Sequence, residues 1–163
     1  MKYQVIPRNL IFLFNQDKVL LQKGAPNKIH WAGLYNGLGG HIEAKENIYS
    51  SATRELMEES GIKLETKDIK LKGIMHVFTY FQEHVFMFIF SADINSENFI
   101  DSEEGTLEWV NINDLGKIKN IAEDIKIIVK EIRKFPEGKI MTGVSEYNKD
   151  RKLTKFEYEI VST

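Results

Sequence analysis

The chain has 163 residues, which is typical of one domain with a buried core, and we expect a single domain over residues 1–163. Its 42% hydrophobic and 28% charged residues are typical of a globular protein, and its formal charge of -2 gives no electrostatic basis for binding a nucleic-acid backbone. The chain contains no cysteine, which excludes disulfides and thiolate metal ligands.

The first predicted element is a β-hairpin. Two apolar runs, Leu10 to Phe14 and Val19 to Leu21, flank the polar turn Asn15-Gln16-Asp17. A loop rich in Gly, Pro and Asn follows from Gly24 to Gly33, and three glycines lie between Asn36 and Ile42. Glycines this dense indicate either close approach of the backbone to another group or φ values that other residues avoid.

A helix is predicted next, from Asn47 to Ser60. Ile48, Ala52 and Leu56 recur every four residues, and Gly61 stands where a C-cap glycine belongs. This apolar stripe would pack on a sheet, so the acidic side chains of the helix would lie on another side.

The rest of the chain is predicted to be mostly strands. The predicted elements are a hairpin from Leu71 to Phe81 and His84 to Ala92 around Gln82-Glu83, an acidic loop from Asn95 to Gly105, a strand from Leu107 to Val110, a helix from Ile118 to Phe135, and a hairpin of Lys139 to Tyr147 with Leu153 to Val161. Two helices therefore interrupt many strands, which favours a mixed α/β fold with helices on the faces of a mixed sheet.

No segment has the features of a membrane span or a targeting signal. The longest apolar run, Val85 to Phe90, is far too short to cross a bilayer, and Met1 to Asn9 lack the apolar region of a signal peptide. We therefore expect a cytoplasmic protein without a membrane partner.

Three glutamates near the end of the first helix form the candidate site. Glu55, Glu58 and Glu59 are three or four residues apart, or adjacent, so their side chains share one side of a helix. A solvated charged face is the ordinary explanation for such a run. However, like charges at this spacing cost roughly a few tenths of a kcal/mol, and the carboxyl end of a helix disfavours anions. A bound cation is the better explanation, and carboxylate oxygens are ligands that Mg2+ accepts.

The residues around these glutamates extend the cluster into a longer motif. From Gly40 to Ile62 the chain reads GHIEAKENIYSSATRELMEESGI, which fits G-x5-E-x7-R-E-U-x-E-E-x-G-U, where U is a bulky aliphatic residue. Seven positions demand one residue type, so a chance match at a given start is on the order of one in a hundred million at roughly 6% usage per type. The segment resembles the signature box of the Nudix (MutT-like) hydrolases, and this resemblance implies an α/β/α sandwich whose box helix lies under a glycine loop.

The resemblance implies hydrolysis of a phosphoanhydride that depends on Mg2+, with Mn2+ able to substitute. The implied metal ligands are the Gly39 carbonyl and the carboxylates of Glu55, Glu58, Glu59 and Glu104. Glu103 is the alternative to Glu104, and the offset to Trp109 favours Glu104.

Two further roles concern proton transfer and its support. Glu58 or Glu55 would be the general base that takes a proton from water, since members of the family differ on this point. Arg54 lies four residues before Glu58 and would orient it, or would form only an ordinary surface ion pair. Glu46 would be an acid near the helix amino terminus, where the helix dipole favours a negative charge, or it would pair with Arg54.

The expected substrate is a small-molecule nucleotide, with a nucleoside triphosphate giving a monophosphate and pyrophosphate. The stretch Tyr35-Asn36-Gly37-Leu38-Gly39-Gly40 resembles the oxidised-purine triphosphatases, which act on compounds such as 8-oxo-dGTP. Asn36 would read a purine edge or simply occupy a turn, Asp124 would belong to the base pocket, and Ile121 departs from that subgroup because it replaces a stacking Trp.

Other parts of the functional assignment stay open. Gly40 and His41 would lie near the substrate phosphates. The alternative substrates are ADP-ribose and dinucleoside polyphosphates, and the alternative outside the enzymes is a nucleotide-sensing domain without turnover. The sequence is compatible with a monomer or a homodimer.

Overall fold

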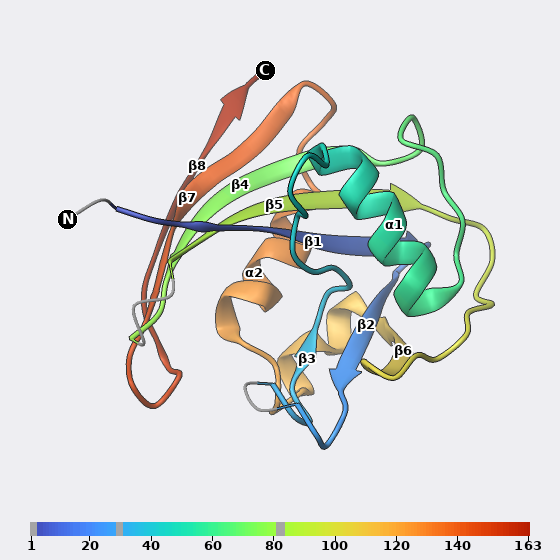
Figure 1. The fold of residues 1–163 in the computed structure, drawn as a ribbon, viewed down its shortest axis with the longest axis horizontal. Helices are drawn as coiled ribbons and strands as arrows, with labels where there is room; N and C mark the ends of the chain where they lie inside the picture. Colours follow the sequence, from blue (N-terminus) through green and yellow to red (C-terminus); the bar gives the residue numbers. More distant parts are fainter. Residues whose placement is uncertain (1–2, 29–30, 81–83) are drawn as a thin grey trace.

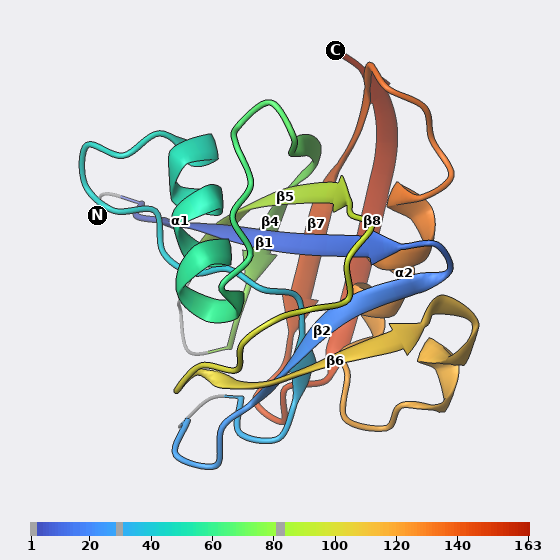
Figure 2. The same cartoon turned by 90° about the vertical axis from the view of Figure 1, so that its right-hand side faces the viewer.

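The computed structural model describes residues 3–28, 31–80 and 84–163, and these form an 8-stranded mixed sheet with an α-helix on each face (Figures 1 and 2). The strands are β1 (Ile6–Asn15), β2 (Lys18–Gly24), β3 (Tyr35–Asn36), β4 (Lys70–Phe78), β5 (His84–Asp93), β6 (Gly105–Asn111), β7 (Lys139–Tyr147) and β8 (Leu153–Ser162). The helices are α1 (Ile48–Ser60), the 3-10 segment η1 (Ile112–Lys117) and α2 (Glu123–Ile132).

The sheet order places the glycine-rich segment beside β1. The strands follow the order β3-β2-β1-β5-β4-β7-β8, with β6 also paired to β2; β1–β5 and β4–β7 are parallel and the other pairs antiparallel. β2 pairs with β1 only at Phe14–Val19 and Asn15–Lys18 and then diverges from it (Figure 2). Leu38 and His41 bridge to Ile11 and Arg8 along the edge of β1 that β2 leaves.

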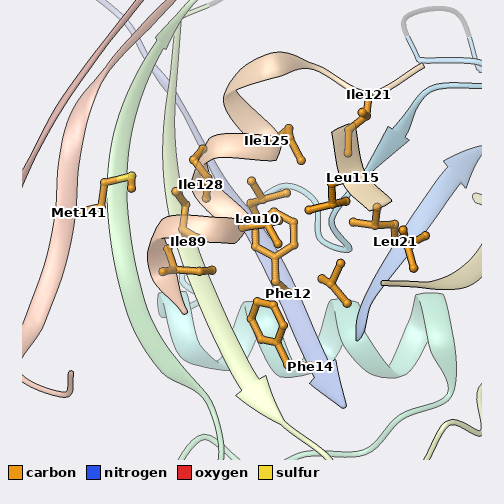
Figure 3. Packing of buried hydrophobic residues seen from close by; sticks show 14 of the residues in the cluster. Leu10, Phe12, Phe14, Leu21, Ile89, Leu115, Ile121, Ile125, Ile128 and Met141 are labelled. Atoms are coloured by element: carbon orange, nitrogen blue, oxygen red, sulfur yellow. The ribbon is translucent and has the colours of Figure 1, made fainter. Parts of the chain in front are cut away.

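Alternation along β1 divides the core into two layers. Leu10, Phe12 and Phe14 are buried on the face covered by α2, and Figure 3 shows them beside side chains of that helix. Ile11 and Leu13 point to the opposite face, where they pack with Ala52 and Leu56 of α1. Because successive strand residues face opposite sides, this continuous apolar run serves both helices.

The structure confirms the predicted α/β/α sandwich and mixed sheet, and it confirms each predicted strand with shifts at the ends. The prediction of the second helix is wrong at its start, since α2 begins at Glu123 and not at Ile118. Tyr35 donates its backbone N–H to the Asn120 carbonyl at 2.7 Å and bridges to Ile121, so this segment is held extended against β3. The prediction was wrong there because the apolar residues before Glu123 have helical spacing although the backbone is extended.

Two further expectations concern the turn between β4 and β5 and the absence of a membrane span. The Gln82-Glu83 turn lies outside the described residues. Among the residues that are described, no helix has the length and apolar character needed to span a bilayer.

Candidate active site

Local signals define both ends of α1, the helix that carries the acidic cluster. The Asn47 side chain accepts hydrogen bonds from the backbone N–H groups of Tyr49 (3.0 Å) and Ser50 (2.9 Å), which caps the amino terminus. Gly61 adopts the left-handed conformation with φ 69° and donates to the Met57 carbonyl, which ends the helix. The cluster therefore sits on a helix whose register is fixed at both ends.

Two glycines bring the backbone of the loop before α1 against the acidic face. Gly39 has φ 125°, and a Cβ there would lie 2.5 Å from the Asn9 carbonyl oxygen. A Cβ on Gly40 would lie 2.6 Å from Oε1 of Glu55. The carbonyls on either side of Gly39 accept from β1, Leu38 O from Ile11 N and Gly40 O from Asn9 N. The glycine pair thus allows the backbone to pass between β1 and a carboxylate.

Arg54 joins the loop and helix carboxylates. Its Nε and Nη2 donate to the two carboxylate oxygens of Glu46 at 2.9 and 3.0 Å. Nη1 donates to Glu55 at 2.9 Å and to Glu58 at 3.1 Å, and Nη2 also reaches the His41 carbonyl at 3.2 Å. The expected Arg54–Glu58 pair is present, but the two-pronged partner of the guanidinium is Glu46, which fixes the position from which Arg54 reaches the other two glutamates.

The three box glutamates differ in burial. Glu59 is only 5% exposed, and its Oε2 accepts from the Gly39 N–H at 2.7 Å. Burial raises the pKa of Glu59 to about 8, with a further rise from the charges of Glu55 and Glu104. Burial also raises the pKa of Glu55, against the opposing effect of Arg54. Glu58 is 59% exposed and lies at the open side of the cluster.

A fourth carboxylate comes from the loop between β5 and β6. Glu104 acts electrostatically on Glu59, and it forms an ion pair of 2.5 Å with Lys28. Its backbone carbonyl accepts from Ala25 N, so the loop is attached to the end of β2. Glu104 rather than Glu103 is therefore the residue whose charge reaches the helix cluster.

The carboxylate oxygens of this cluster are the type of ligand that a hard divalent cation prefers. The repulsion between Glu59, Glu55 and Glu104, which raises the pKa of Glu59, is what a cation would relieve. In the arrangement seen here, no group of three or more His, Cys, Asp or Glu side chains within residues 3–28, 31–80 and 84–163 is placed to hold a metal ion. Here Arg54 donates to one oxygen each of Glu55 and Glu58, and the Gly39 N–H donates to one oxygen of Glu59.

Acid should weaken the fold through Glu46. Hydrogen bonds from Arg54 lower its pKa from 4.5 to about 2, so its contribution to stability is complete above pH 4.5 and is lost as the pH falls towards 2. We expect Glu46→Gln to lower the Tm at pH 7 by about 3 °C, and the difference from wild type to shrink at pH 3. Thermal unfolding followed by circular dichroism, with the exposed Glu43→Gln as control, measures this. A difference independent of pH would contradict the assigned pKa.

The predicted base-recognition residues come from β3 and from the start of α2. Asn36 in β3 is partly buried, and its Oδ1 accepts from Gly37 N at 2.9 Å. Asp124 is 4% exposed in the first turn of α2, where burial raises its pKa. The bridge between Tyr35 and Ile121 brings their two segments together. His41 is exposed and follows Gly40.

Sequence reasoning missed the partner of Asp124. The Tyr147 hydroxyl, at the end of β7, hydrogen-bonds to the Asp124 carboxyl, and burial together with this contact raises the pKa of Tyr147 far above its usual range. The residues are distant in sequence and in elements that meet only in the folded sheet, so no local spacing could have indicated the pair.

Comparisons with known proteins agree with the motif and the fold. Residues 6–132 match the NUDIX domain family. The oxidized purine nucleoside triphosphate hydrolase of Danio rerio is 32% identical over 116 residues, which cover 71% of this chain and 72% of that protein.

Two solved structures share the fold at lower sequence identity. The MutT protein of Bacillus halodurans superposes with a TM-score of 0.80 at 24% identity, covering 95% of this chain and 98% of that one. The NUDIX domain of Shewanella oneidensis NrtR, solved in complex with ADP ribose, superposes with a TM-score of 0.68 at 17% identity, covering 80% and 87%.

Proposed function

The chain belongs to the Nudix hydrolase family, and from this membership we propose that it is a Mg2+-dependent enzyme that hydrolyses a nucleoside triphosphate to a monophosphate and pyrophosphate. The observation that carries the proposal is the approach of Glu55 and Glu59 to the glycine loop, with Arg54 bonded to Glu55 and Glu58. If the cluster were only a solvated charged face, nothing would require Glu59 to be buried, at 5% exposed, near another carboxylate.

We assign the metal to the acidic face of α1. Its ligands would be drawn from the carboxylates of Glu55, Glu58, Glu59 and Glu104 and from the Gly39 carbonyl, with Mn2+ able to replace Mg2+. Bound there, the cation supplies neutralisation of the diphosphate charge and a lower pKa for the attacking water. Holding it requires Glu55 and Glu58 to exchange their hydrogen bonds with Arg54, in whole or in part, for the cation.

The protein residues then divide the work of proton transfer. Glu58 or Glu55 takes a proton from the attacking water, whose oxygen bonds to phosphorus as the phosphoanhydride P–O bond breaks and pyrophosphate leaves. Arg54 sets the position of both glutamates, because the two-pronged bond to Glu46 fixes its guanidinium. The backbone at Gly40 and the exposed His41 would contact the phosphates.

An oxidised purine such as 8-oxo-dGTP is the proposed preferred substrate. The likeness to the Danio rerio enzyme supports this choice. Within the chain, Asn36 in β3 and Asp124 in α2 offer amide and carboxyl groups, and the bridge between Tyr35 and Ile121 brings their two segments together. Ile121 supplies apolar contact without the stacking surface of an indole.

ADP-ribose is the second candidate substrate, because the structurally similar NrtR domain was solved with that compound. Dinucleoside polyphosphates and a sensing domain without turnover are the remaining alternatives. The intact set of Glu55, Glu58 and Glu59 favours an enzyme, since a protein that only binds nucleotides has no need for all three.

A substrate screen decides among these candidates. Purified protein with Mg2+ is expected to release pyrophosphate from 8-oxo-dGTP faster than from dGTP, and to lose this activity when EDTA removes the metal. Release of phosphate-containing products from ADP-ribose or a dinucleoside polyphosphate alone would select the alternative substrates. Binding without turnover of any compound would select the sensing domain.

Asn36→Ala should change substrate choice more than it changes catalysis. Loss of a two-point contact with a purine edge is worth about 1–3 kcal/mol, so we expect kcat/KM for 8-oxo-dGTP to fall about tenfold or more, with a smaller loss for dGTP. Asn15→Ala, at the last residue of β1, is the matched control. Equal losses for both substrates would mean that Asn36 holds the loop and does not read the base.

A further inference from the structure

A pocket lies on the opposite side of the sheet from the acidic cluster. It has a volume of about 330 Å³ and opens between the carboxyl end of α2, the start of β4 and the end of β5. Its walls include Lys70, Lys72, Ser91, Arg133 and Phe135. Because these elements are remote from the glycine loop, the pocket is separate from the proposed active site.

Lys72 is the unusual group in this pocket. Only 9% of the residue is exposed, and it is the extra residue of a β-bulge between Leu71 and Gly73. A bulge redirects a side chain, and here Lys72 lines the pocket. Its ammonium donates to the Phe135 carbonyl at 3.4 Å and lies 5.0 Å from the centre of the Phe135 ring. An ammonium has three donors, so this long hydrogen bond, the one that Lys72 makes within the described part of the chain, leaves capacity for a ligand.

The other basic groups of the pocket have acidic partners. Lys70 pairs with Glu137, and Arg133 pairs with Asp93 at 2.5 Å. Among the described residues, Lys72 takes part in no ion pair. Burial, together with the charges of Lys70 and Arg133, lowers the pKa of Lys72, and the charges of Glu137 and Asp93 only partly oppose this effect.

The charged groups of the pocket indicate that an anion would complement Lys72. The third carboxylate of the pocket, Asp68, is exposed and accepts from the Glu65 N–H at 2.9 Å, so it does not neutralise Lys72. An anion near Lys72 would also be stabilised by Lys70 and Arg133. The buried side chain of Ile132 and the ring of Phe135 supply an apolar wall beside this position.

We propose that this pocket binds a small organic anion, whose phosphate or carboxylate group contacts Lys72 and whose apolar body packs on Ile132 and Phe135. The competing role for Lys72 is structural, in which it only ties the segment after α2 to β4 through the Phe135 carbonyl. The two roles differ in a simple way, since only the first predicts saturable binding of an anion.

The test is a titration of the 15N-labelled full chain with phenyl phosphate, benzoate or neutral phenol, followed by NMR. Both anions are expected to shift the backbone amides of Ser91, Ala92 and Phe135 with a dissociation constant of about 1 mM, a value ordinary for ligands of this size. Phenol is expected to bind at least tenfold more weakly. Shifts at Gly39 and Gly40 report separately on the proposed active site, so the two proposals can fail independently.

Variants identify the group responsible. Lys72→Met should weaken binding of both anions at least tenfold, whereas Lys130→Met, which removes an exposed lysine of α2, should leave it unchanged. The proposal is overturned if the three pocket amides do not respond in the wild type, if phenol binds as well as the anions, or if Lys72→Met retains binding. Should Lys72→Met not fold, the wild-type comparison of anions with phenol still decides.

Discussion

Glu58→Gln is expected to lower kcat about a thousandfold, within the range for loss of a general base, while the protein remains folded. The substitution keeps the size of the side chain and an oxygen that can accept from Arg54, but it removes the negative charge. Glu58 is 59% exposed, and its ion pair with Arg54 is of the i,i+4 type, so the cost in stability should be only about 0.5 kcal/mol. Steady-state kinetics with saturating Mg2+ and a thermal unfolding curve measure the two quantities.

The control for this result is Glu65→Gln, an exposed glutamate outside α1 whose side chain pairs with Lys67. It changes the net charge by the same amount and should leave kcat unchanged. Full activity in Glu58→Gln would remove Glu58 from both proposed roles, ligand and base. A loss of activity with a large loss of stability would point to a structural role.

Comparison with Glu55→Gln addresses which glutamate is the base. Glu55 has only 13% of its side chain exposed and lies against Gly40, so the position of its carboxylate is restricted by its neighbours. A residue that serves mainly as a ligand should raise the Mg2+ concentration needed for half-maximal rate, whereas a base should lower kcat even at saturating Mg2+. The buried position of Glu55 favours the ligand role, and the open position of Glu58 favours contact with water.

Local signals were sufficient to predict α1 and its acidic face. The apolar spacing of Ala52 and Leu56 and the stop at Gly61 both act within a few residues, so they can be read without knowledge of the fold. The same holds for the hairpin of β7 and β8. The start of α2 was predicted wrongly because it depends on long-range pairing, in which β3 holds Ile121 in an extended conformation.

The site was predictable in its residue types and not in its internal contacts. Helical spacing places Glu55, Glu58 and Glu59 on one side, but their burial differs widely because the glycine loop and the Glu104 loop approach from elsewhere in the chain. The partnership of Asp124 with Tyr147 is equally non-local. Sequence spacing carries no signal for contacts that the sheet order alone creates.

Gly40→Ala should separate activity from stability. A Cβ at this position would meet the carboxylate of Glu55 at 2.6 Å, and that carboxylate is the end of a side chain that can rotate away. We expect Glu55 to move, Arg54 to lose one of its partners, and kcat/KM to fall about a hundredfold, the usual cost of a displacement of about 1 Å in a catalytic group. The Tm should change by no more than about 3 °C.

Gly39→Ala is the contrasting substitution, because its obstacle is backbone. The new Cβ would lie 2.5 Å from the Asn9 carbonyl oxygen, and φ 125° is a conformation that alanine avoids. The strand pairing of residues 38–40 with β1 must then shift, so both activity and Tm should fall, with a loss in unfolding free energy of about 1–3 kcal/mol or more. Kinetics and thermal unfolding of both variants, with Gly116→Ala as control at a position where a Cβ meets nothing within 4 Å, test the contrast. If Gly40→Ala kept full activity, the contact between Gly40 and Glu55 would not matter for catalysis; if Gly39→Ala kept full stability, the loop would not need glycine there.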